Sequence, residues 1–112
     1  MKYQKIPNDY KVGGQVMTIN VVERCDENRL GQCCVATGAI EIANKINKDE
    51  RQSNGCRVNT FYHELTHSIL ETMGETELNN NEKFVCCFSS FLTEAMERAF
   101  FEVEDREEEL TK

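Results

Sequence analysis

The sequence predicts an α+β fold in which a small, mostly antiparallel sheet is followed by a helix and then by a long C-terminal helix. Three observations lead to this prediction. Residues 10–43 are rich in β-forming residues interrupted by turn residues, residues 53–73 end at a glycine that is typical of a helix C-terminus, and apolar residues recur at helical spacing from Phe84 to Val103. A chain of 112 residues is long enough for one domain, so we expect residues 1–112 to share a single core.

The first half of the chain carries the strand signals. In "YKVGGQVMTINVVE", residues 10–23, a Gly-Gly pair separates two extended segments, which predicts a hairpin. "CDENRLG" indicates a turn. "QCCVATGAIEIAN" then has β-forming residues on both sides of Thr37-Gly38, so it is expected to form two short strands.

The second half predicts two helices. The first is expected from Ser53 to Met73 with Gly74 as its C-terminal cap, and five residues fall on one stripe that should face the core: Val58, Tyr62, Leu65, Ile69 and Met73. After the connection "GETELNNN", residues Asn79–Asn81 offer a cap for the second helix. The acidic end, "EVEDREEELTK", is expected to be a solvated or frayed helix end.

The apolar stripe of the second helix runs from Phe84 to Val103. It is longer than one partner helix of three or four turns can cover, and Phe101 lies outside it. The excess predicts self-association, with a homo-oligomer formed through the C-terminal helix.

Composition excludes several classes of partner and compartment. The formal charge is −7, and no basic cluster is present, so neither nucleic acid nor a membrane surface is expected as a partner. The N-terminal residues lack the apolar run of a signal peptide, which favours a cytoplasmic protein. In that compartment the six cysteines are expected to be reduced, and no Cys-x-x-Cys pattern supports a thiolate zinc site.

The segment "FYHELTHSILETMG", residues 61–74, contains His-Glu-x-x-His and both histidines of the chain. Two histidines four residues apart on a helix lie on one face, so His63 and His67 can reach one Zn²⁺ ion. Glu64 would lie beside the ion, where a carboxylate can take a proton from metal-bound water. The competing interpretation is an ordinary helix in which the pattern occurs by chance. Two features disfavour chance: the motif lies off the apolar stripe, and it holds both histidines of a His-poor chain.

A third ligand must come from elsewhere in the chain. The lack of a third histidine excludes the metzincins and the SprT-like proteases, and Cys56 lies too close to His63 in sequence for the peptide deformylase pattern. A carboxylate on the next helix remains, and Glu82 fits best because it opens that helix at the margin of the apolar stripe. Glu71 and Glu75 are weaker alternatives. Cys86 shares a face with Glu82 and is a substitute ligand.

The order of these segments, with "LNNNEKFVCCFSSFL" after the histidine helix, resembles small zinc metallopeptidases encoded by bacteriophages and prophages, distantly similar to the ImmA/IrrE group. The resemblance implies a minimal zincin-like domain of the gluzincin type, with zinc-dependent peptidase activity on a peptide or protein substrate. For a phage-encoded protein the compartment would be the host cytoplasm. Cys86 departs from this family, because such proteins often carry a second acidic residue at that position.

Two functions from different classes follow. The first is a zinc metallopeptidase in which His63, His67 and Glu82 hold zinc, Glu64 is the general base, and the peptide lies beside a sheet edge such as "GAIEIAN". The second is a non-enzymatic regulatory or virion-associated protein in which zinc only joins two helices. Glu64 favours the first, because a structural zinc site needs four protein ligands and no base.

Overall fold

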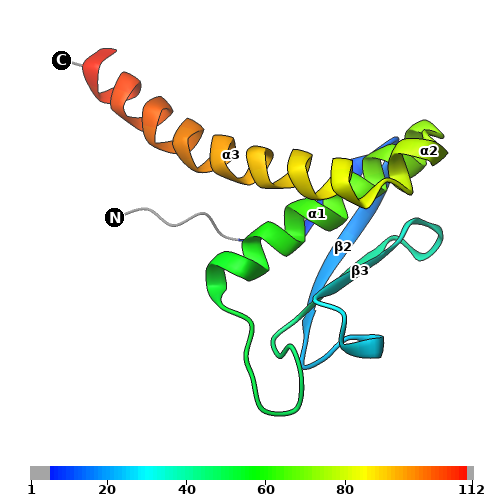
Figure 1. The fold of residues 1–112 in the computed structure, drawn as a ribbon. Helices are drawn as coiled ribbons and strands as arrows, with labels where there is room; N and C mark the ends of the chain where they lie inside the picture. The colour runs from blue at the N-terminus through cyan, green and yellow to red at the C-terminus, as the bar shows by residue number, and fades with distance from the viewer. Residues whose placement is uncertain (1–5, 111–112) are drawn as a thin grey trace.

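The computed structural model describes residues 6–110, with side chains described as far as Glu97. It confirms the α+β prediction: a small four-stranded sheet is followed by helices, the last of which is long (Figure 1). The elements are β1 (Asp9–Val12), β2 (Gln15–Val22), β3 (Gly31–Cys34), β4 (Ala39–Ala43), α1 (Asn54–Met73), α2 (Thr76–Asn79) and α3 (Glu82–Leu110), with 3-10 turns η1 (Asp26–Asn28) and η2 (Val35–Thr37) on either side of β3. None of the helices in the described range is both long and apolar enough to cross a membrane.

The sheet has the strand order β1-β2-β4-β3. The predicted hairpin is present, since β1 and β2 pair antiparallel across Gly13 and Gly14, and β3 pairs antiparallel with β4. The central pair, β2 with β4, is parallel, with Ile19 opposite Ile40. The sheet is therefore mixed, with two antiparallel pairings and one parallel pairing. The predicted "GAIEIAN" segment is not a sheet edge, because β4 has partners on both sides. The edge strands are β1 and β3.

Helix α1 begins and ends where local signals predict. The Ser53 hydroxyl accepts a hydrogen bond from the Cys56 N–H at 3.1 Å, and Gly74 adopts a left-handed φ of 76°, which a residue without Cβ adopts readily. The helix packs on the sheet, and both contribute to one buried cluster: Met17, Ile19, Ile40, Ile42, Val58, Phe61 and Tyr62.

The predicted core stripe of α1 is correct only near the start of the helix. Val58 and Tyr62 are buried, but Leu65 and Ile69 are only partly covered, and Met73 is 64% exposed. The reason is that α1 contacts the sheet on one side and α3 on another, so its buried surface is wider than a single stripe and also includes Phe61 and Leu70.

Helix α3 begins at the predicted cap, because Asn81 Oδ1 accepts the Phe84 N–H at 3.0 Å. Val85 and Ser89 are buried, whereas Phe88 and Phe91 are exposed on another side of the helix. Figure 1 shows α3 continuing well past α1 toward the C-terminus. The predicted apolar residues beyond Glu97 lie outside the described side chains, as do the acidic side chains of the C-terminal end, whose backbone is helical to Leu110. Self-association through this helix stays a prediction.

Candidate metal centre

The two histidines of the chain lie one turn apart on α1 and face the same way. Their Nε2 atoms are 3.2 Å apart, and both side chains are partly buried. This is the shared face that the i, i+4 spacing predicts. Burial lowers the pKa of His63, and His67 lowers it further against the opposing effect of Glu82, so the neutral imidazole that a metal ion requires is favoured at this position.

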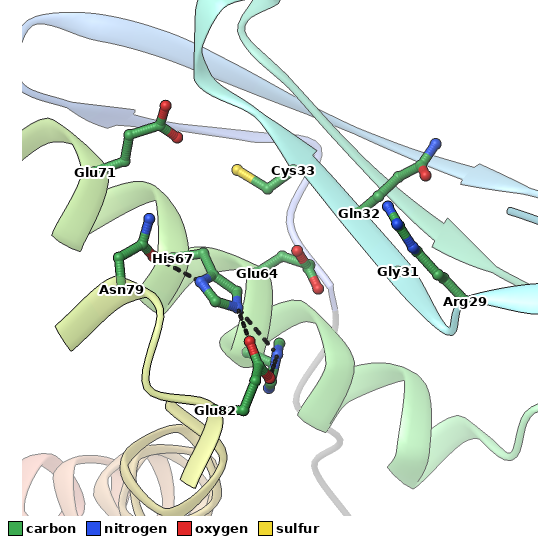
Figure 2. A pocket seen from close by; sticks show the side chains of 10 residues that line it. Arg29, Gly31, Gln32, Cys33, Glu64, His67, Glu71, Asn79 and Glu82 are labelled. Atoms are coloured by element: carbon green, nitrogen blue, oxygen red, sulfur yellow. Dashed lines mark hydrogen bonds and ion pairs between the residues drawn. The ribbon is translucent and has the colours of Figure 1, made fainter. Parts of the chain in front are cut away.

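Glu82, the first residue of α3, reaches toward both histidines (Figure 2). Its Oε2 lies 3.4 Å from His63 Nε2, and its Oε1 lies 3.2 Å from His67 Nε2. Ligands at the usual Zn–N and Zn–O distances of about 2.0–2.2 Å on a tetrahedron are about 3.3–3.6 Å apart. The two histidine nitrogens are thus spaced nearly as two ligands of one ion, and so is each nitrogen with the Glu82 oxygen that it faces. The weaker alternative Glu71 points away from His67 (Figure 2).

Asn79, at the end of α2, orients His67. Its Oδ1 lies 2.6 Å from His67 Nδ1 (Figure 2). Because an amide oxygen only accepts hydrogen bonds, Nδ1 carries the proton, and a neutral His67 keeps its lone pair on Nε2, toward Glu82. Metal-binding histidines commonly donate their other N–H in this way. Sequence reasoning saw Asn79 only as a candidate helix cap, and nothing in its spacing from His67 points to this contact.

The lone pair of a neutral His67 therefore faces a carboxylate oxygen. A cation between the two groups would turn this repulsion of acceptors into two favourable contacts, as would a proton on the imidazole. The arrangement favours a bound positive charge at this point.

Cys86 lies one turn after Glu82 and approaches His63 from the other side of the ring. Its Sγ is 3.8 Å from His63 Nδ1, and one donor atom each of His63, Glu82 and Cys86 lie within 4.8 Å of one another. Partial burial and the Glu82 carboxylate raise the pKa of the Cys86 thiol. None of the six cysteines forms a disulfide.

Glu64 is buried between α1 and the edge strand, with 7% of its surface exposed. A Cβ at Gly31 of β3 would lie 2.5 Å from Thr60 Cγ2 and 3.3 Å from Glu64 Cγ, so only glycine lets the strand approach the helix this closely. Burial raises the pKa of Glu64 to about 7, with Glu82 adding to the effect and with His67 and Arg29 opposing it. A carboxyl in this range is suited to accepting and returning a proton.

Two hollows flank His63 and Glu64. The first, of about 430 Å³, extends past His67 and Asn79 to Gln32, and the second, of about 370 Å³, lies toward Cys86 and Ser89. Both hollows are lined by Arg29, Gly31, His63 and Glu64. The candidate metal centre therefore lies where the two hollows meet. The edge strand β3 borders both hollows, and Figure 2 shows Glu64 directed toward that strand. Sequence reasoning did not identify Arg29 or Gln32, since a turn residue and a strand residue carry no metal or catalytic pattern.

All four predicted site residues, His63, Glu64, His67 and Glu82, are thus brought together, and Cys86 lies beside them. Comparisons of the chain with protein-family models, with curated proteins and with solved structures gave no match.

Proposed function

We propose that this protein is a zinc-dependent metallopeptidase, in which His63, His67 and Glu82 hold the ion and Glu64 is the general base. One observation carries the proposal: two imidazole nitrogens and a carboxylate from two helices converge at distances of 3.2–3.4 Å, next to a buried carboxyl that is not one of the three. Three protein donors with one position left for water are typical of catalytic zinc sites.

Zinc, when bound, supplies a Lewis acid that polarises the peptide carbonyl and lowers the pKa of water at the site. Glu64 accepts a proton from a water molecule while the oxygen of that water adds to the carbonyl carbon. Glu64 then gives the proton to the amide nitrogen as the C–N bond breaks, so that a carboxylic acid and an amine leave. The burial of Glu64 supports this role, because a carboxylate with little water around it holds and releases a proton near neutral pH.

The edge strand supports a peptide as the substrate. β3 pairs with β4 on one side only, and Gly31 borders both hollows beside the centre. An extended peptide can pair with the free backbone groups of such a strand, as in other β-augmented complexes. We propose β3 for this role in place of β4, whose two edges are already paired.

The second candidate is a non-enzymatic protein in which zinc fastens α3 to α1. It is favoured by the origin of the ligands, since His63 and His67 belong to α1 and Glu82 belongs to α3. Under this alternative Glu64 has no role with the metal.

A pair of charge-removing substitutions tests the proposal. In Glu64→Gln the three ligands remain, so zinc should stay bound while hydrolysis falls by orders of magnitude; in Glu82→Gln a neutral amide replaces a charged ligand, so zinc binding itself should weaken. We would measure zinc content and the cleavage of a mixture of unstructured peptides by mass spectrometry. Glu71→Gln is the matched control and should keep its zinc, because this carboxylate lines the larger hollow but points away from His67 (Figure 2).

The two variants must differ for the proposal to stand. If Glu64→Gln loses zinc as readily as Glu82→Gln, then Glu64 is a ligand or a structural carboxylate. If the zinc-loaded wild type cleaves none of the peptides, or if Glu64→Gln cleaves as well as the wild type, the structural alternative is preferred.

A further inference from the structure

His63 uses only one of its two ring nitrogens in the proposed ligand set. Its Nε2 faces His67 and Glu82, whereas its Nδ1 faces the sulfur of Cys86 at 3.8 Å. Glu82 and Cys86 are four residues apart on α3, and such residues share one face of a helix. The result is that His63 and Glu82 lie between two further donors, His67 on one side and Cys86 on the other.

The spacing of the second group suits a metal ion. Donor atoms of His63, Glu82 and Cys86 lie within 4.8 Å of one another. A nitrogen at about 2.0–2.1 Å and a sulfur at about 2.3 Å from one tetrahedral zinc ion are about 3.5–3.6 Å apart, slightly less than the 3.8 Å seen here. The Cys86 sulfur and His63 Nδ1 are thus spaced nearly as two ligands of one ion.

We propose that the metal centre has a second, thiolate-containing ligand set, His63, Glu82 and Cys86, so that a thiophilic ion bound here recruits the Cys86 sulfur. The inference builds on the proposed zinc centre and adds a ligand to it. Binding displaces the thiol proton to solvent, and the resulting thiolate with the Glu82 carboxylate forms a donor set that favours zinc, cadmium or cobalt over magnesium or calcium.

This ligand set has a consequence for the proposed reaction. The Cys86 sulfur lies at His63 Nδ1, whereas His67 lies at His63 Nε2, so an ion bound beside Cys86 is held away from His67. The Cys86-bound form thus competes with the three-ligand set for His63 and Glu82, and it removes the ion from the ligand set proposed for hydrolysis. Cys86 and His63 both line the smaller hollow, so a peptide that enters it lies next to this sulfur and competes for its space.

Cobalt substitution tests the inference without any need for a substrate. The full-length protein is loaded with one equivalent of Co²⁺ under a non-thiol reductant, and a thiolate ligand is read from its sulfur-to-cobalt charge-transfer band in the near ultraviolet. We expect this band in the wild type and in Cys87→Ser, the matched control for an exposed neighbouring cysteine. We expect its loss in Cys86→Ser, which keeps bound cobalt through His63, His67 and Glu82.

The outcomes separate this inference from the proposed function. Cobalt bound with tetrahedral visible bands but without a charge-transfer band in the wild type overturns the role of Cys86 and leaves the zinc peptidase proposal intact. A charge-transfer band that persists in Cys86→Ser also overturns it, because another thiolate is then the ligand. Failure of the wild type to bind cobalt and zinc at all overturns both.

A second measurement uses only the wild-type protein, in case Cys86→Ser does not fold. One equivalent of Cd²⁺ should slow the alkylation of Cys86 by iodoacetamide, while that of Cys87 is unchanged, as determined by peptide mapping. Equal alkylation rates of Cys86 with and without bound Cd²⁺ would contradict the inference.

Discussion

The two sides of helix α1 differ in the groups that they contact. The side toward the sheet is apolar: Phe61 and Tyr62 pack with Ile40 and Ile42, and the ring of Phe61 makes edge-to-face contacts with Tyr10 and Tyr62 at 6.0 and 5.0 Å. The side toward α3 and the edge strand β3 is polar. His63 and His67 face the Glu82 carboxylate there, and Glu64 is directed toward β3 (Figure 2). Contacts within the protein are enough to bury the apolar side.

The polar side brings acceptor atoms together and buries a carboxyl group. Such an arrangement costs folding free energy in the absence of a cation, because a buried carboxylate loses its hydration. One half of the helix surface therefore maintains the fold, whereas the other half holds polar groups in positions that are electrostatically unfavourable without a cation.

Truncation of the apolar side should give the largest change in stability. Phe61→Ala removes a buried ring, so the free energy of unfolding should fall by about 3–5 kcal/mol. In contrast, His63→Ala should cost about 1 kcal/mol, the average for a point substitution. Urea unfolding in the presence of a chelator, so that metal does not contribute, measures both. Equal losses would show that the two sides are not energetically distinct.

The buried carboxyl should make the metal-free protein less stable as the pH rises. The pKa of Glu64 is raised from 4.5 to about 7 in the folded state, so its contribution is fully present below pH 4.5 and is lost as the pH rises through 7. Its size is at most about 3 kcal/mol, from 1.36 kcal/mol per pKa unit. Glu64→Gln should therefore be more stable than the wild type at pH 8 in chelator, with little of this advantage at pH 4.5.

Chemical unfolding of the two proteins across this pH range gives the comparison. Since the other titrating groups are common to both, their difference isolates Glu64. An identical pH dependence in the two proteins would mean that Glu64 is hydrated and ionised in the folded state.

The smallest predicted effect concerns the orientation of His67. Asn79→Ala removes the acceptor of the His67 Nδ1–H, and the loss of such a partner typically weakens metal binding by about 10–100-fold. Competition with a chromophoric chelator measures the zinc affinity. Asn80→Ala, at the exposed neighbouring position, is the matched control and should bind zinc as the wild type does. Unchanged affinity in Asn79→Ala would show that His67 is positioned by its other contacts.

The parts of the fold that depend on neighbouring residues in the sequence could be predicted. Ser53 and Gly74 delimit α1, and Asn81 caps α3, because helix caps are formed by local hydrogen bonds and backbone angles. The shared face of His63 and His67 follows from helix geometry in the same way. Glu82 could be predicted as the third metal ligand because it begins the next helix.

Features that depend on distant residues were not predictable. The parallel pairing of β2 with β4 depends on the path of the intervening chain, and the sequence of either strand carries no signal for its direction. The burial of Glu64 depends on the approach of Gly31 from a strand 33 positions earlier in the chain (64 − 31), and Asn79 meets His67 only because α2 folds back beside α1. Sequence patterns thus identified the groups of the candidate centre but not what surrounds them.

The zinc content of the purified protein is the most direct measure of the proposed metal centre. Wild-type protein purified without chelator should contain about one zinc ion per chain, as an open three-ligand site implies. His63→Ala should contain almost none while remaining folded by circular dichroism, since the apolar side of α1 is intact. Full zinc occupancy in folded His63→Ala, or no zinc in the wild type after dialysis against zinc, would contradict a metal centre at His63, His67 and Glu82.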